Sequence, residues 1–140
     1  MLDKALQAGA VALKQGLAYI CSLKYPRVSK RDAEETFNDR FRSNHFPPWD
    51  KQFKMLDEKM QNYMMHYILR LANRRGLTYQ FHTGLHAGNG NHIGNSNPEL
   101  LTNLFLDYPD VTFDVFHIGY PYQMTVSALA KMFTKRWFIG

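Results

Sequence analysis

The chain has 140 residues, of which 45% are hydrophobic, 14% aromatic and 21% charged, with a single cysteine, Cys21. This composition is typical of one globular domain over residues 1–140 and excludes a disordered, collagen-like or disulfide-rich chain. No apolar run approaches the roughly 20 residues of a membrane span, and the first residues lack the order of a signal peptide. Because a lone cysteine cannot pair within the chain, we expect a cytoplasmic protein in a reducing compartment.

The formal net charge of +5 raises the question of nucleic-acid binding. The basic residues are spread over residues 24–59, 70–75 and 131–136, mostly along expected helix faces and ends, where the helix dipole favours cations. We interpret the charge as solvated helix surface and expect neither a nucleic-acid nor a membrane partner. A nucleic-acid stripe is the less favoured alternative.

Strand and helix patterns alternate along the chain. The expected elements, in order, are a helix over 2–7, an apolar, buried strand over 10–13 ending near Lys14, a helix over 30–43 capped by Ser29, a helix from 49 or 50 to 75, a strand over 77–82, a helix over 98–107, a strand over 111–117, a helix over 122–133 and a strand over 136–139. Apolar residues at steps of three and four in the long helix predict one buried stripe. Its members are Phe53, Leu56, Met60, Tyr63, Met64, Tyr67, Ile68 and Leu71.

This order of elements predicts parallel strands joined by helices. Four such strands make half of a (β/α)8 barrel, which usually takes about 250 residues. We therefore expect an α/β fold, a partial (β/α)8 barrel of about four βα units, in a chain that is a fragment of a longer barrel.

Two histidines occupy equivalent places in this pattern. His82 and His117 each end a predicted strand and precede a glycine-containing turn. Working residues of parallel α/β folds lie at the carboxyl ends of strands, and imidazole is the commonest protein ligand of zinc. The pair predicts two ligands of one divalent metal ion. The alternative is that one or both only hydrogen-bond the loop backbone.

Other candidate residues lie near the same strand ends. Lys14 could hold an anionic group of a substrate, bridge metal ions after carboxylation, or be a solvated lysine. His86 and His92, in a loop rich in glycine and asparagine, could touch substrate or metal, although such loop histidines are more often only exposed. His45 and His66 are interpreted as structural.

The segments YQFHTGLHAGNGNHIGNSNPELLTNLF and YPDVTFDVFHIGYPY, with GAVALKQGLAY near the start, resemble the amidohydrolase-related family of metal-dependent hydrolases. The same type of domain is found fused to glutamine-synthetase-like proteins. The resemblance covers nearly the whole chain in order. It implies a (β/α)8 barrel in which a divalent metal, usually zinc, activates water to hydrolyse a C–N or ester-like bond, or assists decarboxylation in some relatives.

In that family a His-x-His pair on the first strand, one histidine on each of the fifth and sixth strands and an aspartate on the eighth complete the metal site. The resemblance matches His82 to the fifth-strand histidine, His117 to the sixth-strand histidine and Lys14 to a fourth-strand lysine. It implies substrate contacts for Lys14, His86 and Tyr120. The matched positions that shape the barrel mouth are Thr83, Gly84, Asn97, Pro98, Tyr120 and Pro121.

The chain also departs from the family pattern. It contains no His-x-His sequence and no eighth strand with an aspartate, and Ile20 and Cys21 stand where relatives tend to carry a basic residue. Our first hypothesis is that the chain forms strands four to seven of the barrel of an amidohydrolase-type enzyme, which uses a divalent metal, most often zinc, to hydrolyse a small molecule. The second is a catalytically inactive α/β binding or oligomerisation module. Under both, exposed strand edges predict self-association or pairing with the missing barrel half.

Overall fold

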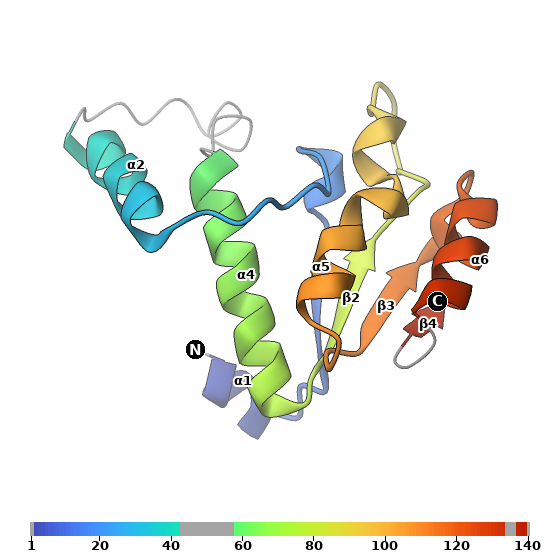
Figure 1. Cartoon of the computed structure of the whole chain (residues 1–140), viewed down its shortest axis with the longest axis horizontal. Helices are drawn as coiled ribbons and strands as arrows, with labels where there is room; N and C mark the ends of the chain where they lie inside the picture. The colour runs from blue at the N-terminus through green and yellow to red at the C-terminus, as the bar shows by residue number, and fades with distance from the viewer. Residues whose placement is uncertain (1, 43–57, 134–136, 140) are drawn as a thin grey trace.

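The computed structural model describes residues 2–42, 58–133 and 137–139 (Figure 1). The elements are α1 (Leu2–Gln7), β1 (Ala12–Gln15), the 3-10 turn η1 (Leu17–Tyr19), α2 (Lys30–Arg42), α4 (Glu58–Arg75), β2 (Thr78–His82), the 3-10 turns η3 (Ile93–Ser96) and η4 (Pro98–Leu101), α5 (Thr102–Asp107), β3 (Phe113–Phe116), the 3-10 turn η5 (His117–Gly119), α6 (Gln123–Met132) and β4 (Trp137–Ile139). Among these helices, none has both the length and the apolar character needed to cross a bilayer.

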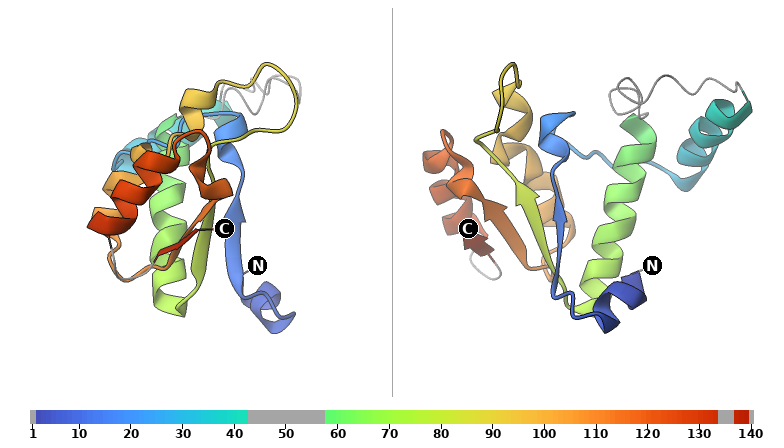
Figure 2. Two further views of the ribbon diagram at one scale, coloured as in Figure 1. Left: turned by 90° about the vertical axis from the view of Figure 1, so that its right-hand side faces the viewer. Right: turned by 180° about the vertical axis from the view of Figure 1, so that it is seen from behind.

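The four strands form one parallel sheet in the order β1-β2-β3-β4. Because each right-handed crossover leads to the next strand in the same direction, the helices fall on one face. Figure 2 shows α4, α5 and α6 together on one side of the sheet. A doubly wound sheet would reverse the strand order and carry helices on both faces. The fold prediction is confirmed: the chain is α/β, and its described residues form a partial (β/α)8 barrel of four parallel strands with helices between them.

The hydrophobic core lies between the sheet and these helices. Strand side chains alternate between the two faces of a sheet, and on β2 and β3 the buried set includes Tyr79, Phe81, Phe113 and Val115. The helices contribute buried side chains to the same cluster, among them Leu69 of α4, Leu104 of α5 and Val126 of α6. The alternation places the intervening residues on the face opposite the helices, which is the interior side of a barrel.

The first strand differs from the prediction in position and burial. It covers Ala12–Gln15 rather than residues 10–13, and Val11 is 81% exposed. Within the described part of the chain β1 pairs only with β2, so it is an edge strand and its apolar run has no neighbour on the outer side. The expectation of a buried strand is therefore wrong for this chain.

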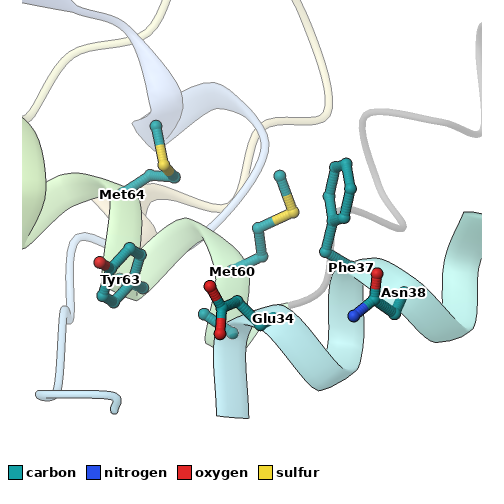
Figure 3. Close-up of a pocket in the computed structure, with 7 residues that line it drawn as sticks. Glu34, Phe37, Asn38, Met60, Tyr63 and Met64 are labelled. Atoms are coloured by element: carbon teal, nitrogen blue, oxygen red, sulfur yellow. The ribbon is translucent and has the colours of Figure 1, made fainter. Parts of the chain in front are cut away.

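The buried stripe predicted for the long helix is also wrong. Met64 and Tyr67 are 39% and 42% exposed, and the buried residues of α4 are Asn62, Met65, His66, Leu69 and Ala72. The residues Met60, Tyr63 and Met64 instead face α2, where with Phe37 and others they line an open cavity of about 450 Å³ (Figure 3). The predicted helix start, the stripe members before Glu58 and His45 lie outside the described residues.

The remaining element boundaries follow the sequence signals closely. Ser29 Oγ accepts a hydrogen bond from the Asp32 amide, so it caps α2 as predicted. The helix expected over 98–107 divides into η4 and α5, and the side chain of Asn97 accepts from the Glu99 amide at its start. The strand expected over 111–117 is shorter, because His117 already begins the turn η5.

Candidate metal centre

His82 and His117 lie side by side at the carboxyl edge of the sheet. His82 is the last residue of β2, and His117 directly follows β3. The parallel register sets His82 opposite Phe116, which brings the two imidazole centroids to 4.7 Å with their planes at 75°. The structure thus brings together the two histidines that the sequence singles out, while their role as metal ligands stays a prediction.

The His82 ring is buried and held by the backbone. Its Nε2 lies 2.8 Å from the carbonyl oxygen of Leu85. A carbonyl only accepts, so Nε2 carries the proton and Nδ1 keeps the lone pair. Metal-ligating histidines almost always make such a second hydrogen bond.

The electrostatic surroundings keep His82 neutral. Desolvation is the main cause that lowers the pKa of His82, the nearby His117, Lys14 and His86 lower it further, and the bond to Leu85 acts in the opposite direction. The neutral imidazole is the form that binds a metal ion.

His117 adopts an unusual backbone conformation. Its φ is 64° and that of Ile118 is 50°, both in the left-handed region that residues other than glycine rarely occupy. Each such residue costs on the order of 1–3 kcal/mol, and residues of this kind cluster at active sites. The Tyr120 amide donates to the His117 carbonyl and closes the turn at 3.0 Å.

A third imidazole joins the pair. The His86 ring lies nearly parallel to that of His82, with centroids 5.6 Å apart. The Tyr19 ring is tilted against both, with its centroid 4.5 Å from that of His86 and 4.7 Å from that of His82. Both ring nitrogens of His86 are enclosed without a hydrogen-bond partner among the described residues. Desolvation lowers the pKa of His86. His86 is therefore part of the cluster rather than a merely exposed loop residue, whereas His92 is exposed.

Sequence reasoning missed Tyr19. The sequence does carry a signal for Tyr19, namely its place directly after a strand. Tyr19 ends the 3-10 turn that follows β1, and His86 lies in the segment that follows β2. Both residues therefore belong to the set of turns at the carboxyl edge.

Lys14 lies one layer toward the amino ends of the strands. Its Nζ is 3.6 Å from the centroid of the Phe116 ring. The register aligns Lys14 with Gln80 and Gln80 with Asp114, and Gln80 Nε2 donates to Asp114 Oδ2. Partial desolvation lowers the pKa of Lys14, and the Asp114 charge opposes that shift. The Lys14 side chain is largely exposed and also contacts the Phe116 ring, so both a substrate contact and a solvated lysine stay open.

The polar layer around Lys14 holds one unsatisfied acceptor. Asp114 Oδ1 is enclosed without a partner in the described ranges. Sequence reasoning missed Gln80 and Asp114, although both occupy the strand face opposite the core. Tyr120 stands apart from this layer, with a side chain that is 55% exposed and open to a ligand.

The residues present fit part of a metal shell. His82 offers a lone pair on Nδ1, and His117 lies beside it. Zinc sites use three or four protein ligands, and within residues 2–42, 58–133 and 137–139 no three His, Cys, Asp or Glu side chains are grouped to hold an ion. Further ligands would have to come from elsewhere.

Comparisons with known proteins concern the family and the fold of the chain. The amidohydrolase family model matches residues 37–138. The structure of a candidate metal-dependent hydrolase from Lactobacillus casei superposes with a TM-score of 0.78 at 19% identity, covering 99% of this chain and 35% of that one. An uncharacterized TIM-barrel protein from Bordetella bronchiseptica gives a TM-score of 0.47 at 21% identity, covering 54% of this chain and 26% of that one. The comparison with curated proteins finds no match.

The chain spans about a third of the length of the Lactobacillus protein, and its fold matches that part almost from end to end. The family match covers well over half of the chain and includes both strands that lead to the histidines. The chain belongs to the amidohydrolase family.

Proposed function

We propose that this chain forms part of the active site of a metal-dependent hydrolase, which cleaves a C–N or ester-like bond of a small molecule. The observation that carries the proposal is the juxtaposition of His82 and His117 at the carboxyl ends of adjacent parallel strands. Membership of the amidohydrolase family supports a hydrolase.

His82 and His117 would hold a divalent metal, for which we propose zinc because imidazole nitrogen suits that ion. A bound zinc ion supplies a water of lowered pKa and a Lewis acid for the bond that is cleaved. The carbonyl of Leu85 orients the His82 ring and fixes its tautomer.

For the substrate we propose Lys14, His86 and Tyr120. The enclosed ring nitrogens of His86 offer one donor and one acceptor, and the exposed Tyr120 hydroxyl can reach a ligand. Desolvation lowers the pKa of Lys14 against the opposing charge of Asp114. The Lys14 ammonium would hold an anionic group of the substrate, and its neutral amine is the form that carboxylation would need for bridging metal ions.

We further propose that the missing ligands come from βα units that close the barrel, either in a longer chain or in a partner. Three features of the described residues support such an addition: one sheet face has no helix over it, the outer edge of β1 has no paired strand, and Asp114 Oδ1 has no hydrogen-bond partner. A reducing, cytoplasmic location is our proposal from the lone cysteine, which is a free thiol.

The second candidate function is a binding or oligomerisation module without catalysis. It is favoured because the described residues offer two imidazoles and do not group a third metal ligand with them. A metal-bound water needs several fixed ligands to set its geometry.

Zinc-dependent hydrolysis of a chromogenic ester distinguishes the two candidates. We expect hydrolysis above the zinc-only background when the βα units that supply the missing ligands are present, in a longer chain or in a partner, and loss of that excess in His82→Ala and His117→Ala. His92→Ala, which changes an exposed loop histidine, serves as the control and should retain it. Zinc binding without any excess hydrolysis would favour the inactive module.

A further inference from the structure

A buried hydroxyl links the two strand ends that carry the histidines. Thr83, which is fully buried, directly follows His82, and its Oγ1 donates to the Phe116 carbonyl at 2.6 Å. Phe116 directly precedes His117. The regular register of β2 and β3 ends at His82 and Phe116, so this side-chain bond continues the pairing one residue further.

The turns that follow the histidines are also in direct contact. The Gly84 amide donates to the Ser96 carbonyl at 2.9 Å, and the hydroxyl of the fully buried Ser96 lies 2.7 Å from the Gly84 carbonyl. A Cβ on Gly84 would lie 2.2 Å from the carbonyl oxygen of Tyr120. The turn after His82 is thus hydrogen-bonded to Ser96 on one side. On the other side it packs closely against the turn after His117.

The bond from Thr83 acts on the peptide group that sets the direction of His117. The Phe116 carbonyl and the His117 amide share one rigid plane. Fixing the carbonyl restricts the rotation of that plane, and with it the left-handed φ of 64° at His117. A backbone conformation of this kind persists only when the surrounding structure holds it in place.

We propose that Thr83 is a positioning residue, whose hydroxyl holds the Phe116–His117 peptide so that the His117 imidazole faces His82. That the two imidazoles lie close together in order to bind one metal ion rests on the proposed function. The spacing itself is a property of the metal-free chain, and it can be measured without zinc.

The test measures the nuclear Overhauser effect between the His82 and His117 ring protons in the metal-free protein. It compares the wild type with Thr83→Val, Thr83→Ser and Thr102→Val. Thr83→Val removes the hydroxyl at nearly constant volume and should weaken the contact severalfold, while Thr83→Ser keeps the hydroxyl and should retain it. Thr102→Val is the matched control, because Thr102 Oγ1 also donates to a carbonyl at 2.6 Å, that of Glu99, away from the histidines. It should leave the contact unchanged.

Zinc titration gives the second readout. Loss of a group that orients a ligand typically lowers metal affinity about 10- to 100-fold, and we expect a fall in this range for Thr83→Val only. Wild-type ring contacts in Thr83→Val, or an equal loss in Thr83→Ser, would overturn the proposal. If Thr83→Val does not fold, Thr83→Ala decides in the same way. Contacts that respond as expected in a chain that binds no zinc would support the positioning role and count against the proposed function.

Discussion

Gly84 lies where the turn after His82 closely approaches the turn after His117. Its φ is 65°, and a Cβ there would overlap the Tyr120 carbonyl. Gly84→Ala should therefore destabilise the chain by about 2–5 kcal/mol, through the left-handed backbone and the overlap together. Urea unfolding measures the loss.

Gly88→Ala is the control for Gly84, because Gly88 also has a positive φ, of 84°, but nothing lies within 4 Å of its Cβ position. It should cost only the backbone contribution, about 1–2 kcal/mol. Equal losses in the two variants would contradict the close approach of the turns.

His66 supplies a pH dependence that does not involve the candidate site. Its Nε2 donates to the Tyr25 carbonyl at 2.9 Å, so its Nδ1, 2.8 Å from Tyr108 Oη, accepts. Desolvation lowers the pKa of His66, although the bond to Tyr25 opposes the shift. The unfolded chain, with its imidazoles near 6.5, takes up protons first as the pH falls, and the free energy of unfolding should decline below about pH 6.5.

His82 and His86 contribute to this decline with the same sign, since their pKa values are also lowered. His66→Gln should make the decline of the free energy of unfolding with falling pH shallower, and His92→Gln, at an exposed site, should not. Urea unfolding at several pH values between 7 and 5 measures this decline. An unchanged slope in His66→Gln would contradict the buried, neutral state of this histidine.

The positions of His82 and His117 could be predicted at the residue scale because strand patterns followed by glycine turns are local signals. The left-handed backbone of His117 could not, since only contacts with distant residues such as Thr83 hold it. The same applies to His86 and Tyr19, whose ring contact joins segments that are far apart in the sequence.

At the scale of elements, α4 shows where periodicity fails. Its apolar residues occupy two adjoining faces, one against the sheet and one toward α2, and spacing alone does not tell which face is buried. Neighbouring methionines test the structure. Met65 is 3% exposed and Met64 is 39% exposed.

Met65→Ala should therefore cost about 2–5 kcal/mol, while Met64→Ala should cost less than about 1 kcal/mol. Thermal or urea unfolding of the two variants gives the comparison. A larger loss for Met64→Ala would mean that the predicted stripe, and not the observed one, faces the core.

At the scale of the whole molecule, the described helices cover only one face of the sheet (Figure 2). Parallel sheets are almost always covered on both, so we expect the chain to self-associate when no other barrel half is present. Ala12→Lys would place a second charge on the exposed, uncovered side of the edge strand and should weaken association. Ser127→Lys, on the exposed face of α6, should not.

Sedimentation equilibrium over a range of concentrations measures this association. A wild-type chain that stays monomeric throughout, with the fold intact, would contradict the expectation. So would equal behaviour of the two lysine variants.

The overall architecture could be predicted because the order of strands and helices leaves few topologies, and the parallel sheet follows from the crossover rule. The complete site could not be predicted from this sequence, and the reason is physical. A (β/α)8 barrel gathers its working residues from several strand ends. The described part of this chain has four strands, with the histidine pair at the ends of the middle two.

The metal content of the purified chain tests the histidine metal centre directly, and mass spectrometry measures it after equilibration with zinc and removal of free ion. We expect about one zinc ion per chain or per pair of chains, lost in both His82→Ala and His117→Ala and retained in His92→Ala. A folded wild-type chain that retains no zinc, or equal retention in all four proteins, would contradict the claim that the two strand-end histidines form a metal centre.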